Sequence, residues 1–153
     1  LTSFGIDGFR IDAAKHISAT DLSAILTQAG KPFVYQEVIY GGKDEVVQPE
    51  EYQNIGMVLE SRFTGGGLDE KFRSKISGLK NIGESWGFLP SAKAQVMVTN
   101  HDYERSGGSI SYKDGAIYRL ANVFMLGWPY GYPQVMSGYD FGTSTMALAP
   151  LRY

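Results

Sequence analysis

Short apolar segments alternate along this chain with stretches of helical periodicity, and this alternation limits the possible folds more than any other feature of the sequence. The apolar segments are rich in β-branched and aromatic residues, which favour strands. The stretches between them are long enough for helical crossovers, so consecutive strands are expected to be parallel. The pattern predicts an α/β fold with five strands, at about Gly8–Asp12, Phe33–Glu37, Met57–Ser61, Ala94–Val98 and Tyr132–Ser137.

Three helices are predicted between these strands, and long polar loops are expected at 39–52 and 103–113. The first helix has its N-cap candidates in the segment Ser18–Leu22 and ends at Gly30. The second is a charged helix over about Asp69–Gly78, which follows three glycines at 65–67. The third and clearest spans Asp114–Leu126, and its predicted buried stripe consists of Ala116, Leu120, Val123 and Phe124.

Ionisable residues follow several of the strands, as they do at the catalytic ends of open parallel sheets and of (β/α) barrels. A doubly wound nucleotide-binding sheet needs a glycine-rich turn directly after its first strand. Here the turn at 12–16 reads Asp-Ala-Ala-Lys-His and contains no glycine, so a barrel is favoured. A complete barrel has eight strands and about 250 residues. Five strands in 153 residues therefore predict roughly the second half of a barrel.

The composition excludes several classes of protein. The net charge is −2, from 14 basic and 16 acidic residues, which indicates neither a nucleic-acid-binding surface nor a polybasic membrane patch. The chain has no cysteine, so disulfides and thiolate metal sites are excluded. No apolar run approaches the roughly 20 residues of a membrane helix. The chain begins at Leu1 and not at methionine, so we expect a piece of a longer protein, and a missing signal peptide then says nothing about its compartment.

Three carboxylates are expected at strand ends, namely Asp12, Glu37 and Asp102. Arg10 lies two residues before Asp12, on the same face of the strand, and favours the ionised form of that carboxylate. Glu37 follows an apolar strand with no cation nearby in sequence, so desolvation favours its protonated form. A nucleophile and a protonated acid on neighbouring strands can reach the separation of about 5 to 5.5 Å that a retaining glycosidase needs.

Simpler interpretations stay open at each of these positions. Arg10 and Asp12 can form a structural ion pair, Glu37 can be a solvated strand end, and residues 100–102 can be an Asx-type turn. The aromatic candidates are equally open, because a ring that stacks on glucose units also packs well in a core. The rings in question are those of Tyr40, Trp86 and Tyr103, whereas Trp128 is expected to be structural.

The sequence contains, in this order, the segments Gly8–His16, Gln36–Ile39 and Val98–Asp102. Together they resemble three motifs of the α-amylase family of glycoside hydrolases, most closely those of animal-type α-amylases and their bacterial relatives, and the similarity extends to Val47–Tyr52 and Tyr112–Gly115. The resemblance implies the C-terminal part, about strands 4 to 8, of a truncated (β/α)8 TIM barrel. It also implies retaining endo-hydrolysis of α-1,4-glucosidic bonds in starch or glycogen, with maltooligosaccharides as further ligands.

Carried over position by position, the resemblance implies a role for each carboxylate. Asp12 is expected to be the nucleophile that forms a covalent glycosyl-enzyme, Glu37 the acid/base, and Asp102 the residue that stabilises the transition state. Arg10 is expected to orient Asp12, and His101 to bind the sugar at the cleavage point. The leaving-group side is expected to be lined by Lys15, His16 and Ile39.

The resemblance also implies two ions. The main-chain carbonyl of His16 is expected to be one ligand of a structural calcium ion, and chloride-dependent members hold their anion with the residues matching Arg10 and Asn100. Gln134 stands where those members have a third, basic ligand, so weak or absent chloride binding is expected. A metal hydrolase that uses His16 and His101 is disfavoured, because the two histidines lie in unrelated motifs.

Residues 1–153 are interpreted as a partial catalytic barrel domain. The first barrel strands, the calcium-binding B domain and the C-terminal β domain are not in this sequence, so the isolated chain is expected to be unstable and inactive. The complete protein is expected to be a secreted monomer. One alternative is a non-catalytic barrel homologue that acts as a partner subunit, which the presence of all three carboxylates disfavours. The other is an α-glucosidase or transglycosylase of the same family.

Overall fold

Five parallel strands form one sheet, in which each strand pairs with its neighbours along the chain. The computed structural model describes residues 2–136, and the strand order is β1-β2-β3-β4-β5. The predicted parallel α/β architecture is therefore confirmed, although the predicted fifth strand runs to Ser137, which lies outside the described residues. The strands are β1 (Gly8–Ile11), β2 (Phe33–Gln36), β3 (Met57–Leu59), β4 (Ala94–Met97) and β5 (Tyr132–Gln134).

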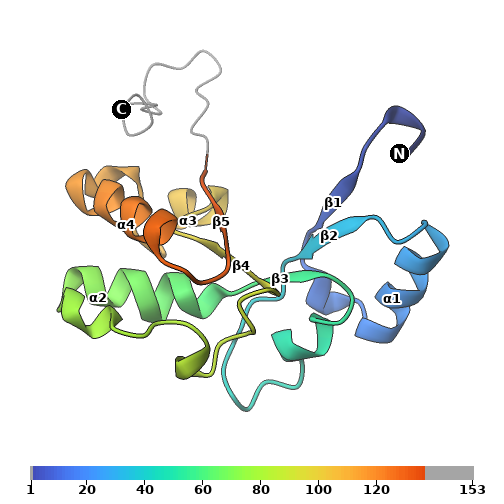
Figure 1. Ribbon diagram of the computed structural model, residues 1–153, viewed down its shortest axis with the longest axis horizontal. Helices are drawn as coiled ribbons and strands as arrows, with labels where there is room; N and C mark the ends of the chain where they lie inside the picture. The colour runs from blue at the N-terminus through green and yellow to red at the C-terminus, as the bar shows by residue number, and fades with distance from the viewer. Residues whose placement is uncertain (1, 137–153) are drawn as a thin grey trace.

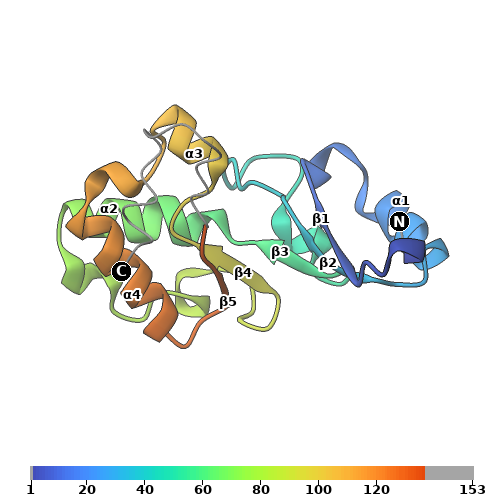
Figure 2. The ribbon, with the colours of Figure 1, turned by 90° about the horizontal axis from the view of Figure 1, so that it is seen from above.

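This strand order decides between the two α/β architectures. A doubly wound sheet reverses its strand order at a switch point, whereas this sheet never reverses. Because crossovers between parallel strands are right-handed, a sheet without reversal carries its helices on one face and leaves the other face free to curl inward. Figures 1 and 2 show α1 beside β1 and β2, α2 and α4 beside β4 and β5, and the strands β1 and β5 at the two ends of the sheet.

The α-helices are short, and further single turns of 3-10 helix lie in the connections between strands and helices. Ser18 caps α1 as predicted, since its hydroxyl accepts a hydrogen bond from the Asp21 N–H at 3.1 Å. The α-helices are α1 (Ala19–Gln28), α2 (Glu70–Arg73), α3 (His101–Ser106) and α4 (Ala116–Gly127). The 3-10 turns are Thr2–Phe4, Ala14–His16, Pro49–Tyr52, Ile76–Leu79, Glu84–Trp86 and Tyr112–Asp114. None of the helices in residues 2–136 has the length and apolarity needed to cross a membrane.

The predicted charged helix over Asp69–Gly78 is wrong at both ends. The helical segment begins at Ser61, continues as a π-helix over Phe63–Asp69 and ends with α2 at Arg73, so the three glycines lie inside it. Close packing accounts for one of them: a Cβ atom on Gly67 would lie 2.5 Å from Ile82 Cδ1. Gly67 therefore allows close approach of the helix to its neighbour, whereas a Cβ atom on Gly65 or Gly66 would meet no other atom within 4 Å.

The buried face of α4 also differs from the prediction. Leu120 and Val123 are 55% and 68% exposed, while the helix buries Tyr118, Ala121 and Met125. Apolar residues lie on more than one face of this helix, so periodicity alone does not identify the face that packs on the sheet. Ala116 is exposed as well, so of the four predicted members only Phe124 packs against the core, and its ring stacks on Trp128 with 5.2 Å between ring centroids.

Candidate active site

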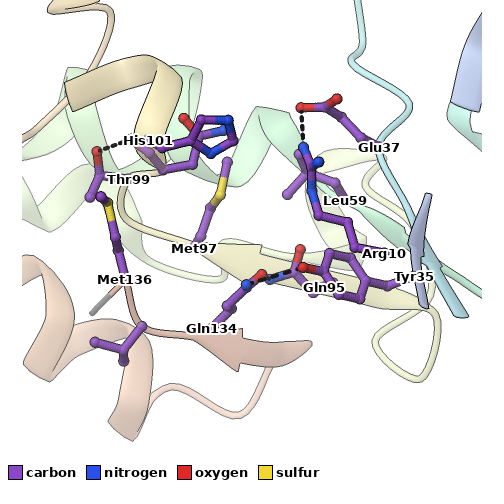
Figure 3. A pocket seen from close by; sticks show the side chains of 12 residues that line it. Arg10, Tyr35, Glu37, Leu59, Gln95, Met97, Thr99, His101, Gln134 and Met136 are labelled. Carbon is purple, nitrogen blue, oxygen red and sulfur yellow. Dashed lines mark hydrogen bonds and ion pairs between the residues drawn. The ribbon is translucent and has the colours of Figure 1, made fainter. Parts of the chain in front are cut away.

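Side chains from all five strands and their following segments surround a pocket of about 260 Å³ at the carboxyl ends of the strands (Figure 3). Parallel strands bring their carboxyl ends to one edge, which is why residues far apart in sequence meet here. The pocket is lined by Arg10, Tyr35, Glu37, Leu59, Gln95, Met97, Thr99, Asn100, His101, Gln134, Val135 and Met136.

Arg10 joins two of the predicted catalytic carboxylates. Its guanidinium forms one hydrogen-bonded ion pair with Asp12, and Nη2 lies 3.0 Å from Glu37 Oε1 on the neighbouring strand. Burial opposes the charge of Arg10, but the hydrogen bond to Asp12 and the charges of both carboxylates raise its pKa above the usual value. Asp12 and Glu37 are therefore both within reach of a single, permanently charged group.

Glu37 is more enclosed than Asp12. Its side chain is 13% exposed against 73% for Asp12, and Oε2 accepts a hydrogen bond from the Ala13 N–H at 3.0 Å. Ala13 has φ 45° and ψ 40°, a left-handed conformation that is uncommon for alanine. Glu37 has no cation nearby in sequence, but in space it has one, because the register that pairs Ile11 with Gln36 brings Arg10 across from β1.

His101 and Asp102 lie in the first turn of α3 and are exposed. Their side chains are 52% and 59% exposed, with 3.4 Å between His101 Nε2 and Asp102 Oδ2. Asn100 caps this helix, since its Oδ1 accepts hydrogen bonds from the N–H groups of Asp102 and Tyr103. The loop expected from Tyr103 onward therefore begins as a helix. His101 lines the pocket, whereas of the three predicted carboxylates only Glu37 is among its lining residues. Arg10 joins Asp12 to Glu37, and Asp102 lies beside His101.

Tyr103 links these groups electrostatically. Burial raises the pKa of its hydroxyl, and the negative charges of Glu37 and Asp102 raise it further. Both carboxylates therefore act on the same ring. Tyr103 also lines a second pocket of about 430 Å³, the aromatic pocket, together with Ile39, Tyr40, Ser61, Arg62, Gly65, Gly66, Trp86 and Phe88.

The aromatic pocket collects all three predicted stacking residues, Tyr40, Trp86 and Tyr103, and the predicted leaving-group residue Ile39. Trp128 lies elsewhere and donates a hydrogen bond from Nε1 to the Ile82 carbonyl at 2.8 Å, which agrees with a structural role. The two other leaving-group residues follow β1 in the 3-10 turn. His16 is exposed there, and Lys15 Nζ lies 2.7 Å from Glu45 Oε1.

Gln134 occupies the same pocket as Arg10 and Asn100, the two predicted chloride ligands. Its Oε1 accepts a hydrogen bond from Gln95 Nε2 at 2.5 Å, and its Nε2 donates to the Tyr35 hydroxyl at 3.2 Å. The Gln134 amide is thus held between two neighbours, and the position carries no positive charge.

Calcium is the second ion that the resemblance implies, beside chloride. A calcium ion takes six to eight oxygen ligands. Among residues 2–136, no three His, Asp or Glu side chains lie close enough together to hold a metal ion. The side chains of this part of the chain therefore do not fit a calcium site by themselves. His16 is expected to supply one main-chain carbonyl, so most of the calcium ligands must come from other groups.

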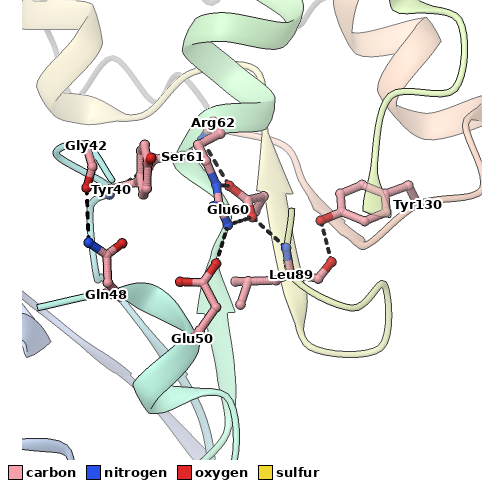
Figure 4. A network of polar contacts seen from close by, with 9 residues as sticks. All are labelled: Tyr40, Gly42, Gln48, Glu50, Glu60, Ser61, Arg62, Leu89 and Tyr130. Atoms are coloured by element: carbon pink, nitrogen blue, oxygen red, sulfur yellow. Dashed lines mark hydrogen bonds and ion pairs between the residues drawn. The ribbon is translucent and has the colours of Figure 1, made fainter. Parts of the chain in front are cut away.

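A buried ion pair at the end of β3 was missed by the sequence interpretation. Glu60 follows β3 directly, is 1% exposed and binds Arg62 with both carboxylate oxygens (Figure 4). The available signal was its position, because Glu60 ends an apolar strand just as Glu37 does. Glu60 belongs to the predicted strand Met57–Ser61, for which no functional residue is predicted.

The sequence is similar to several α-amylases, although no family model matches it. It is 51% identical over 145 residues to the α-amylase of Aeromonas hydrophila, covering 92% of this chain and 32% of that protein. It is 40% identical over 158 residues to the α-amylase of Tenebrio molitor, covering 92% of this chain and 33% of that protein.

Solved structures give the same result. The α-amylase I of Eisenia fetida superposes with a TM-score of 0.79 at 35% identity, over 89% of this chain and 31% of that one. A variant of that enzyme in complex with maltohexaose gives 0.80 at 34% identity, with the same coverage. The chain spans about a third of the length of these relatives. On this similarity of sequence and structure, the chain belongs to the α-amylase family.

Proposed function

We propose that this chain supplies about strands 4 to 8 of a (β/α)8 barrel that hydrolyses α-1,4-glucosidic bonds in starch or glycogen. The neighbour-to-neighbour parallel strand order supports the barrel, and the similarity to α-amylases supports the reaction. The first barrel strands, the calcium-binding B domain and the C-terminal β domain belong to the two-thirds of the relatives that this chain does not match. By the same resemblance, the complete protein is a secreted monomer.

The observation that carries the proposal is the position of Arg10 between Asp12 and Glu37. In the first step, an Asp12 carboxylate oxygen attacks the anomeric carbon while Glu37 gives its proton to the departing glycosidic oxygen. In the second step, Glu37 takes a proton from water, and that water displaces Asp12, so configuration is retained. Glu37 forms an ion pair with Arg10 and accepts a hydrogen bond from the Ala13 N–H, so the glycosidic oxygen must replace one of these partners before Glu37 donates to it.

The remaining site residues bind the substrate in this proposal. Asp102 and His101 hold the hydroxyls of the sugar at the cleavage point, and their exposure leaves them free to close on it. Lys15, His16 and Ile39 line the leaving-group side, where the rings of the aromatic pocket stack on glucose units. The His16 carbonyl is one calcium ligand, and the neutral Gln134 leaves chloride weakly bound or unbound.

The test uses the complete barrel, which we define as the polypeptide in which this chain supplies the third that it matches. The Aeromonas hydrophila α-amylase with that third replaced by this chain is one such protein, and the product profile on soluble starch is the measurement. A ladder of maltooligosaccharides is expected. Glucose as the sole product indicates an α-glucosidase, and no cleavage by a folded protein rejects the proposed function.

A further inference from the structure

Arg62, like Arg10, forms ion pairs with two carboxylates. Its Nη2 lies 2.6 Å from Glu60 Oε2 and 2.9 Å from Glu50 Oε1, and its Nε donates to Glu60 Oε1 at 2.7 Å. Burial opposes its charge, but the hydrogen bonds and charges of these two carboxylates raise its pKa above the usual value. Glu60 and Arg62 are therefore locked together by a bidentate pair at the end of β3.

One side of this pair fastens the loop that carries Glu37. The Arg62 guanidinium lies over the Tyr40 ring, 4.7 Å from its centroid, and the Tyr40 N–H donates to the Ser61 hydroxyl at 3.0 Å. Glu37 is thus fixed by β2 before it and by Tyr40 three residues after it. Figure 4 shows Tyr40, Ser61 and Arg62 together above the buried Glu60.

The other side of the pair fastens the loop that contributes Trp86 and Phe88 to the aromatic pocket. Glu60 Oε2 accepts a hydrogen bond from the Leu89 N–H at 2.9 Å, and Arg62 lies over the Phe88 ring at 5.4 Å. The Leu89 carbonyl in turn accepts from the Tyr130 hydroxyl at 2.8 Å. Tyr40 and Phe88, which both line the aromatic pocket, therefore contact the same guanidinium.

We propose that Arg62, held by Glu60, is a positioning residue of the active site. It acts through Tyr40 on the placement of Glu37, and through Phe88 on the width of the aromatic pocket. The role requires a planar group that stacks on two rings while it binds two carboxylates, which arginine provides and lysine does not. This inference rests on the proposed function, because Glu37 is taken as the acid/base.

The test compares Arg62→Lys, Arg62→Met and Glu60→Gln in the complete barrel, at a temperature well below unfolding. A displacement of about 1 Å at a reacting group can cost about 100-fold in rate. We therefore expect kcat to fall about 10- to 100-fold in Arg62→Met, with a rise in KM for starch. Arg62→Lys is expected to recover part of the loss. The double variant Glu60→Gln/Arg62→Met is expected to lose little more than either single variant, because the two residues act as a unit.

Arg73→Met is the matched control. Arg73 also binds two carboxylates, Asp69 and Asp114, but it is 44% exposed and joins α2 to the turn before α4. Wild-type kcat and KM in Arg62→Lys and Arg62→Met, or an equal loss in Arg73→Met, overturn the proposal. So does a loss of activity that only follows the loss of folded protein.

Amide hydrogen exchange gives a second measurement that does not depend on activity. Exchange at 38–41 and at 86–89 is expected to quicken in Arg62→Met while β1 and β2 stay protected. If the wild-type complete barrel does not cleave starch, the proposed function fails and this measurement still decides whether Arg62 fixes the two loops. Unchanged exchange at both loops rejects the positioning role.

Discussion

Arg10 on β1 reaches across the sheet to Glu37 at the end of β2, with 3.0 Å between Nη2 and Oε1, while the same guanidinium holds Asp12. The two carboxylates proposed for catalysis are therefore held at a fixed spacing by one side chain. A planar group with several N–H donors can do this, whereas an ammonium group acts as a single point charge.

Arg10→Lys is accordingly expected to reduce kcat on starch in the complete barrel by about 10- to 100-fold, and Arg10→Met by more. Both variants are measured beside Arg105→Lys, which changes an exposed arginine on α3. Full activity in Arg10→Met would mean that the Arg10 bridge serves stability alone.

Asp12→Ala removes the proposed nucleophile. Turnover of starch is expected to fall by roughly 1,000-fold or more, with binding of maltooligosaccharides largely kept, because the lost interaction is made in the transition state. Asp44→Ala, an exposed carboxylate in the loop after β2, serves as the control and is expected to keep its activity. Starch hydrolysis near the wild-type rate in Asp12→Ala rejects the nucleophile assignment.

Gln134→Arg adds a positive charge beside Arg10 in the pocket that these residues share. Wild-type activity is expected to be nearly independent of chloride, and activity of the variant to rise with chloride concentration, because an added guanidinium attracts an anion. Activity is measured over a chloride titration at constant ionic strength, with the chloride replaced by acetate. Strong chloride dependence of the wild type contradicts the prediction.

The Lys15–Glu45 pair predicts a pH dependence of stability. The hydrogen bond from Lys15 lowers the pKa of Glu45 in the folded protein, so its stabilising effect is present above the ordinary glutamate pKa and is lost as pH falls through the lowered value. Glu45→Gln is expected to lower the Tm of the complete barrel at neutral pH, by an amount that shrinks in acid. Lys15→Met should behave in the same way, and a Tm difference that does not change with pH argues against this explanation.

Within residues 2–136, β1 and β5 have no outer neighbours in the sheet, and Leu120, Val123 and Leu126 are exposed on α4. Unpaired strand edges and apolar stripes promote association. We expect the 153-residue chain alone to aggregate and to bind a hydrophobic dye. Cooperative unfolding of a soluble, monomeric sample, followed by circular dichroism and sedimentation, would refute this expectation.

The sequence predicted features that depend on neighbouring residues in the chain. The five strands follow from local runs of apolar residues, and the start of α1 follows from the capping preference of Ser18. The motifs Gly8–His16, Gln36–Ile39 and Val98–Asp102 were recognisable because their spacing is a property of the chain. No three-dimensional contact was needed for any of them.

Features that depend on contacts between strands were not predictable in this way. Arg10 meets Glu37 through strand register, and Arg62 meets Tyr40 and Phe88 across two loops. Neither of these sets of contacts produces a local pattern in the sequence. The helix start was misplaced at the three glycines 65–67 because glycine disfavours helix by propensity, although these residues lie inside the π-helix and Gly67 packs closely against Ile82.

The neighbour-to-neighbour order of the strands has a kinetic consequence. Gly8 pairs with Phe33, Tyr35 with Met57, and Gln95 with Tyr132, so each pairing closes a loop of a few tens of residues. Loop-closure entropy grows slowly with loop length, and folding slows as the sequence separation between contacting residues increases. Each strand can therefore dock on the one before it as the chain is synthesised. Closure of a complete barrel at its outer strands then becomes the long-range and slow step.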